Sequence, residues 1–132
     1  MLIYHVALAS DWEAARAAGE YRVSTLGRTL ESEGFIHCSY PGQVEHTANA
    51  FYGAVSGALV LLSVDTERVG SEVVAENTGG GIELFPHVYG PIPAAAVVAV
   101  TELSRDADGR IVVPELVPRG ESTSVSESDP LG

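Results

Sequence analysis

Short apolar runs recur along the chain, separated by turns that contain glycine, proline or aspartate. Residues 2–8 are apolar on both of the faces that alternate along a strand, which predicts a central strand. Residues 58–64 are the most apolar stretch and predict a second central strand. Further strands, with a turn at residues 90–93, are predicted at residues 35–39, 73–76, 83–89 and 96–103. Residues 110–113 are predicted to close a hairpin with the last of these strands.

The first predicted helix covers residues 11–18, which are rich in alanine. Ser10 and Glu13 have the spacing of a capping box at its start, and Gly19 is placed to end it. We therefore expect a short helix directly after the first strand.

Two more short helices are predicted further along the chain. The first covers residues 24–32, with Ser24 as its cap and Gly34 as its stop, because Leu26 and Leu30 lie four positions apart. The other begins at Pro41 and is expected to place three apolar residues on one face: Val44, Ala48 and Phe51.

These elements predict an α+β fold, since the predicted strands and the three short helices do not alternate strictly. We expect two small, mostly antiparallel sheets with the short helices packed at the side. Residues 1–117 are predicted to form a single globular domain. Residues 118–132 are acidic and rich in serine, with little apolar surface to offset the entropy of ordering, and are predicted to be a disordered tail.

Composition excludes several classes of protein. The chain of 132 residues has a net charge of −11 and no lysine, which disfavours binding to nucleic acid. Cys38 is the single cysteine, so the chain has no internal disulfide, and we expect Cys38 to be a small core residue. The sequence has neither the pattern of a signal peptide nor an apolar run of membrane length, which predicts a cytoplasmic protein without a membrane partner.

Three of the four histidines lie inside apolar runs: His5, His37 and His87. Burying an imidazole costs free energy unless its nitrogens find partners, so three such residues suggest a shared cleft in which they move protons. The alternative is that each ring is a core residue holding a backbone carbonyl or a hydroxyl. We expect no metal, because histidine pairs with the spacing of metal ligands are missing. His46 is expected to be solvated.

Other side chains could complete this site. Glu76 precedes the glycine-rich residues 77–81 and could orient a histidine, whereas Glu33 is expected to be a solvated end of its element. The glycine run is expected to be a plain loop, with a phosphate-contacting turn or a mobile flap as alternatives. Aromatic residues could supply a stacking wall for a planar ligand or belong to the core: Tyr4, Trp12, Tyr21 and Tyr89.

Several motifs together resemble a known family. Residues 3–7, Trp12, residues 33–39 with Gln43, and residues 85–91 are similar to the small bacterial family called domain of unknown function 952, over about residues 2–115. The resemblance implies a compact fold like that of ADP-ribosyltransferases. It also implies that His5 matches the first-strand histidine that contacts a ribose of NAD in some of those enzymes. The strand of His37, Cys38 and Ser39 would then lie near the nicotinamide end.

From the residues and this resemblance we expect a transferase-like or histidine-based acid/base enzyme acting on a nucleotide-like, NAD-related or other small polar metabolite. His37 or His87 would be the general acid or base, and Glu76 would orient or stabilise charge. The remaining expected site residues bind the ligand: His5, Ser39, Tyr89, Tyr4 and Trp12. The alternatives are a non-catalytic binding module with the same cleft and a purely structural set of histidines.

Overall fold

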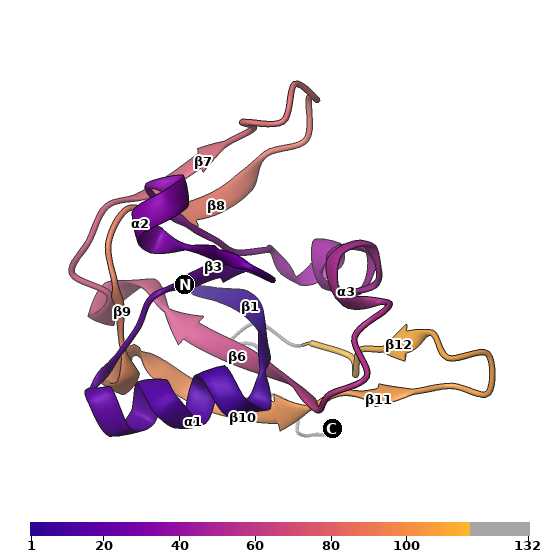
Figure 1. Cartoon of the computed structure of the whole chain (residues 1–132). Coiled ribbons are helices and arrows are strands. Elements are labelled where there is room, and N and C mark those ends of the chain that lie inside the picture. The colour runs from indigo at the N-terminus through magenta and orange to yellow at the C-terminus, as the bar shows by residue number, and fades with distance from the viewer. Residues whose placement is uncertain (117–132) are drawn as a thin grey trace, which may run out of the picture.

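The computed structural model describes residues 1–116, which form a mixed α+β structure (Figure 1). Within these residues every strand pairing is antiparallel, in two sheets of three strands and three ladders of two strands. The prediction of an α+β fold built on small antiparallel sheets is therefore confirmed. The predicted tail at residues 118–132 lies outside the described residues.

The first sheet has the strand order β1 (Leu2–Leu8), β6 (Leu59–Asp65) and β10 (Val97–Glu102). The prediction that the most apolar run forms a central strand is confirmed, because β6 pairs with a strand on each side. The prediction was wrong for β1, which is an edge strand of this sheet. Its apolar character on both faces comes from packing above and below it, and not from a strand on each side.

Both faces of the first sheet are buried in core clusters. Ile3 and Leu62 pack on one face, in a cluster that includes Trp12 from α1 and is called the first core cluster below. Tyr4 and Leu61 pack on the other face, against α3. The alternation of side chains along a strand sends neighbouring residues to opposite clusters. The sheet therefore forms the middle layer of the fold.

The second sheet has the order β5 (Ile36–His37), β8 (Phe85–Val88) and β7 (Val73–Glu76). A backbone bridge between Tyr4 and Ser39 links it to β1, so the two sheets meet at the first strand. The strands predicted at residues 35–39 and 83–89 are thus present but shorter than expected.

The first helix, α1 (Ala9–Ala18), ends at Gly19 as predicted, where a positive φ of 91° requires a glycine. Its predicted capping box is wrong, because the helix begins two residues earlier, after Leu8, and no side chain caps it. The third predicted helix is present as η1 (Pro41–Gln43) followed by α3 (Val44–Tyr52).

The helix predicted over residues 24–32 is wrong. These residues form a hairpin of β3 (Val23–Thr25) and β4 (Arg28–Thr29), followed by the single-turn helix α2 (Leu30–Glu33). Gly27, with a φ of 75°, makes the turn, and Leu26 at its tip is exposed. Leu26 and Leu30 therefore do not share a helix face, although Gly34 does end α2 as predicted.

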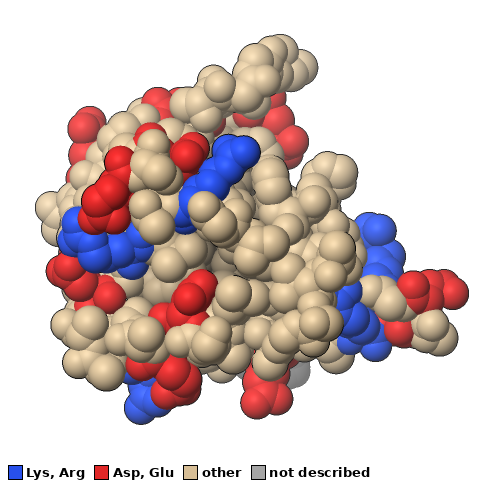
Figure 2. Space-filling model, viewed as in Figure 1, with Lys and Arg blue, Asp and Glu red and all other residues tan. Residues whose placement is uncertain are grey.

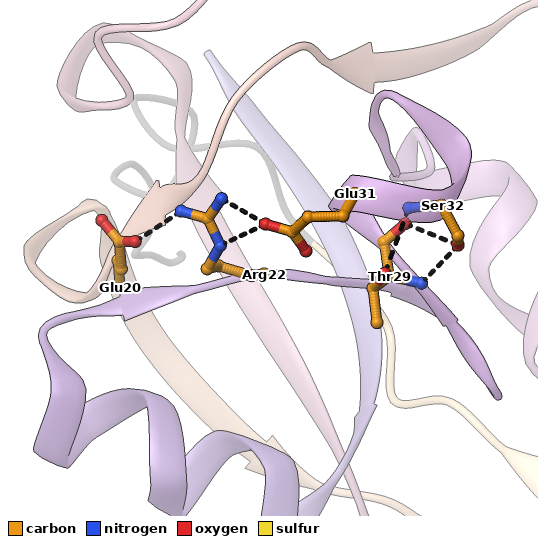
Figure 3. A network of polar contacts seen from close by, with 5 residues as sticks. All are labelled: Glu20, Arg22, Thr29, Glu31 and Ser32. Carbon is orange, nitrogen blue, oxygen red and sulfur yellow. Dashed lines mark hydrogen bonds and ion pairs between the residues drawn. The ribbon is translucent and has the colours of Figure 1, made fainter.

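Polar contacts fasten this segment (Figure 3). Thr29 caps α2 in place of the predicted Ser24, accepting a hydrogen bond from the Ser32 amide at 3.1 Å and donating its own amide to the Ser32 hydroxyl at 3.0 Å. The guanidinium of Arg22 lies between Glu20 and Glu31 and bonds to both. These contacts join the chain before β3 to α2.

The remaining elements complete the edges of the fold. β2 (Glu20–Tyr21) pairs with β9 (Ile92–Pro93), which occupies part of the turn predicted at residues 90–93. The predicted hairpin partner of residues 110–113 was wrong, because β12 (Ile111–Val112) pairs with the separate strand β11 (Ser104–Arg105). Single 3₁₀ turns precede the chain segments of β7 and β10: η2 (Thr66–Arg68) and η3 (Ala94–Ala96). In residues 1–116 no helix is long and apolar enough to span a membrane.

Candidate functional site

The register of the second sheet brings two of the predicted histidines together. His37 on β5 lies directly opposite His87 on β8, so both side chains stand on the same face. His37 Nδ1 lies 3.1 Å from His87 Nε2, and the ring centroids are 5.1 Å apart. Residues 50 positions apart in the sequence thus form one hydrogen-bonded pair.

The opposite face of the same sheet belongs to the core. Ile36, Cys38 and Val88 alternate with the histidines along their strands and are fully buried in the first core cluster. Cys38 is therefore a core residue, as predicted, and burial raises the pKa of its thiol. One face of the sheet holds the fold together, and the other carries the polar groups.

Glu76, the last residue of β7, extends the histidine pair. Its Oε2 atom lies 3.0 Å from His87 Nδ1 and also accepts a hydrogen bond from the hydroxyl of Tyr89. The hydrogen bond from Tyr89, followed by that from His87, lowers the pKa of the Glu76 carboxyl. The same bond to Glu76 raises the pKa of Tyr89. Glu76 is therefore an ionised acceptor between two donors.

The direction of the hydrogen bonds follows from this ionised carboxylate. Because Glu76 only accepts, His87 Nδ1 carries the proton, and in a neutral ring His87 Nε2 must then accept. His37 Nδ1 is consequently the donor to His87. The second nitrogen of His37, Nε2, is left with a free lone pair. It is the one buried side-chain polar atom without a partner in the part of the chain that the structure describes.

The surroundings of His37 keep its ring neutral. Burial, and then the nearby His87, lower the pKa of His37 from 6.5 to about 4. A neutral ring with Nδ1 protonated satisfies the hydrogen bond to His87, whereas protonating Nε2 as well would place a charge in a poorly solvated position. His37 is thus neutral at neutral pH, with Nε2 unprotonated.

His5 holds the backbone of His37 in place and does not line the main cleft. Its Nδ1 donates to the His37 carbonyl at 2.7 Å, and its Nε2 accepts from the Tyr21 hydroxyl at 3.0 Å. The His37 amide in turn donates to Ser24 Oγ at 3.2 Å. Burial lowers the pKa of His5 to about 4, so this ring is also neutral. Both ring nitrogens of His5 thus have protein partners, and the expected contact of His5 with a ligand stays a prediction.

A cleft with a volume of about 680 Å³ lies over the polar face of the second sheet. Its walls come from β5, β8, α3, the β3–β4 hairpin and the loop between β7 and β8. All three phenylalanines of the chain and three of its four histidines line it: Phe35, Phe51, Phe85, His37, His46 and His87. This volume is within the range of sites for small organic ligands.

The aromatic rings surround the histidine pair. Phe35 stacks on His87 with a centroid distance of 4.1 Å, which leaves His87 almost fully buried. The Phe85 and Phe51 rings lie 5.0 Å and 6.1 Å from the His37 ring. The histidines thus form the floor of the cleft, and the phenylalanines shield them from water.

The loop between β7 and β8 borders the cleft and is fastened at both ends. Asn77 Oδ1 accepts from the amides of Gly79 and Gly81 at 2.8 Å and 3.0 Å, while its Nδ2 donates to the Glu83 carbonyl. Gln43, at the end of η1, donates to the Glu83 carboxylate at 3.0 Å and to a carbonyl of the loop. The glycine run is therefore a loop organised by Asn77, with part of its length facing the cleft.

The other residues expected to contact a ligand lie elsewhere. Trp12 is buried in the first core cluster. Tyr4 and Ser39 are buried beside His5, around a separate small cavity of about 10 Å³. Tyr89 is partly exposed, where it contacts Glu76 and the Phe35 ring.

Sequence reasoning missed one wall of the cleft. His46 is exposed, as expected, and it lines the cleft together with Phe51. Phe51 was expected on one helix face with Val44 and Ala48, but those two are buried whereas Phe51 is half-exposed. The sequence did hold a signal for this wall, since residues 46 and 50, and residues 47 and 51, are spaced four apart and lie next to one another on the helix surface.

At the rim of the cleft, Arg28 Nη1 lies 3.7 Å from Glu33 Oε1. No group of three or more potential metal ligands is found among residues 1–116.

Comparisons with known proteins agree with this fold. Among curated proteins, no sequence matches the chain significantly. The crystal structure of protein CC0527 from Caulobacter crescentus superposes with a TM-score of 0.72 at 34% identity, covering 85% of this chain and 94% of that protein. The solution structure of CC0527 gives a TM-score of 0.67 at 35% identity, covering 82% and 89%. The family model of a protein of unknown function, DUF952, matches residues 6–100, and the chain belongs to this family.

Proposed function

We propose that this protein is an enzyme that performs acid/base chemistry on a nucleotide-like, NAD-related or other small polar metabolite bound in the cleft. The observation that carries the proposal is the hydrogen-bonded series from Glu76 through His87 to His37, at the floor of a cleft of ligand size. An ionised carboxylate that orients a histidine is a common device for general base catalysis.

The proposed proton transfer balances within this series. His37 Nε2 accepts a proton from the substrate, and the proton on His37 Nδ1 moves to His87 Nε2. His37 is then neutral again with Nε2 protonated, and the positive charge lies on His87 next to the Glu76 carboxylate. The carboxylate of Glu76 stabilises that charge, because Glu76 Oε2 lies 3.0 Å from His87 Nδ1. The return of the protons along the same path makes His37 the general acid.

A kinship with ADP-ribosyltransferases is part of the proposal. Its support is the pair of small antiparallel sheets joined at Tyr4 and Ser39, with the cleft over the second sheet. NAD or a related nucleotide is then the first ligand to test. In our mechanism Glu76 orients His87, because its carboxylate already accepts hydrogen bonds from His87 and from Tyr89. His5 positions His37 through the backbone.

The test begins with ligand-induced changes in melting temperature for NAD, ADP-ribose and nucleotides, because a ligand that binds the folded state raises it. Turnover of any ligand found is then followed by mass spectrometry. We expect His37→Gln and Glu76→Gln to lower turnover at least 100-fold while the ligand still raises the melting temperature. Glu102→Gln, which removes the same charge from the first sheet, should leave turnover unchanged. Normal turnover in His37→Gln would refute the proposed mechanism.

A non-catalytic binding module is the second candidate, and one observation favours it. His37 Nε2 is covered in this structure, so a substrate reaches it only after neighbouring groups move. A binding module predicts that His37→Gln and Glu76→Gln change affinity and that no conversion of the ligand occurs. A purely structural set predicts a lower melting temperature in these variants and no ligand effect.

A further inference from the structure

The distribution of aromatic residues points to the kind of ligand that the cleft recognises. The core is built from aliphatic residues together with tyrosine and tryptophan, whereas all three phenylalanines lie at the cleft. Phe51 is 51% exposed, although it is the most apolar side chain of its helix face. Rings left at the wall of a cavity offer a flat surface for stacking.

The charges at the cleft are unbalanced. Its lining holds two carboxylates, Glu33 and Glu83, against one guanidinium, Arg28, which lies at the rim beside Glu33. Glu83 is held by the neutral side chain of Gln43 and has no cationic partner within residues 1–116. On the face shown in Figure 2, the basic groups lie next to acidic ones, and no separate basic patch is seen. The lining of the cleft therefore holds more carboxylates than guanidinium groups.

We propose that the cleft binds the part of its ligand that is a small, flat organic cation. This inference rests on the proposed function only in using the same cleft, and it names the charge and shape of the group bound there. The negative face of a phenyl ring attracts a cation, and the attraction increases when water is excluded. The uncompensated Glu83 and the net charge of −11 act in the same direction. A phosphate group would meet the opposite field.

The experiment compares three probes of nearly equal size and shape: benzamidine, which is a cation, benzamide, which is neutral, and benzoate, which is an anion. Their dissociation constants are measured by titration calorimetry and by ¹H–¹⁵N NMR at low and high salt. We expect benzamidine to bind about tenfold more tightly than benzamide, and benzoate to bind most weakly. NMR shifts should map to the cleft lining. Equal binding of the cation and the neutral probe, or preference for benzoate, would overturn the inference.

Two variants separate the sources of the preference. Phe51→Leu keeps an apolar side chain but removes the aromatic face, and Glu83→Gln removes the charge while keeping an oxygen for Gln43. Each should reduce the ratio of benzamidine to benzamide affinity about threefold, whereas Glu102→Gln should not change it. An unchanged ratio in both variants would refute the assigned recognition.

The outcomes also distinguish this inference from the proposed function. If benzamidine binds selectively but no substrate turnover depends on His37, the proposed catalysis fails and the inference stands. If turnover depends on His37 while the neutral probe binds as well as the cation, the inference fails and the proposed function stands.

Discussion

The two three-stranded sheets of this protein differ in what covers their two faces. In the first sheet, Leu61 and Leu62 on β6 point to opposite sides, and both are fully buried. In the second sheet, Ile36 enters the core, whereas its neighbour His37 faces the cleft. The first sheet therefore contributes mainly to stability, and one face of the second is free to carry chemistry.

The comparison teaches how polar groups are accommodated near a core. His5 lies on the first sheet and is buried, and both of its nitrogens have partners. His37 lies on the second sheet and has one unpartnered nitrogen. Because an unpaired buried polar atom costs free energy, it persists where something else selects for it. This difference separates a structural histidine from a candidate functional one.

The largest expected loss of stability comes from truncating a side chain in the first sheet, the middle layer of the fold. Leu62→Ala removes a fully buried side chain from the central strand β6, where it lies between His5 and Val100. We expect a loss of about 2–5 kcal/mol in the free energy of unfolding, because the cavity cannot be filled from either side. Urea denaturation measures it. A loss below about 1 kcal/mol would contradict the assignment of this sheet as the main source of stability.

A smaller loss is expected from the link between the two sheets. Tyr21→Phe keeps the ring but removes the hydroxyl that donates to His5 Nε2, leaving a buried acceptor without a partner. The expected loss in the free energy of unfolding is about 1–3 kcal/mol by denaturant titration. The matched change Tyr89→Phe removes a hydroxyl from the more exposed second sheet and should cost less. Equal losses would erase the contrast between the two regions.

Much of the first region could be predicted from the sequence. The runs at residues 2–8 and 58–64 are strands because both of their faces are apolar, and this signal is local. The order of strands was not predictable, because β1 is apolar on both faces without being central. Residues 24–32 were predicted as a helix because the spacing of Leu26 and Leu30 outweighed the turn signal of Gly27.

The site was predictable only where strand alternation determines it. His37 and His87 could each be placed in a strand because each lies in an apolar run, but their shared face and direct pairing depend on a register that no local pattern encodes. His5 follows the same alternation and yet lies behind the cleft, because β1 belongs to the other sheet. The contribution of α3 was missed because Phe51 was grouped with Val44 and Ala48 on one helix face, whereas Phe51 lines the cleft.

The dependence of stability on pH sharpens the comparison further. Folding lowers the pKa of both His5 and His37 from 6.5 to about 4, so the unfolded chain binds more protons between these values. The free energy of unfolding is therefore unaffected by these two histidines above pH 6.5 and decreases as the pH falls from 6.5 to about 4, because the unfolded chain takes up protons that the folded protein does not. We expect His37→Gln to reduce the slope of stability against pH in this range by up to about 1.4 kcal/mol per pH unit.

The control for this measurement is His46→Gln, which replaces an exposed histidine at the cleft mouth. The change in slope caused by His37→Gln is compared with the change caused by this variant. If His37→Gln leaves the slope unchanged, His37 is not held neutral by its surroundings, and the hydrogen-bond directions derived above are wrong.

The smallest effect is expected at the cleft wall, within a single helix. Phe51→Ala and Val44→Ala both lie in α3, and both gain helix propensity, so the difference between them reports burial. Val44 is fully buried against the first sheet, and its truncation should cost about 2 kcal/mol in the free energy of unfolding. Phe51 faces the cleft and is half-exposed, so its truncation should change that free energy by less than about 0.5 kcal/mol. A large loss at Phe51 would mean that the phenylalanine wall stabilises the fold, and the argument that these rings are kept for a ligand would then fail.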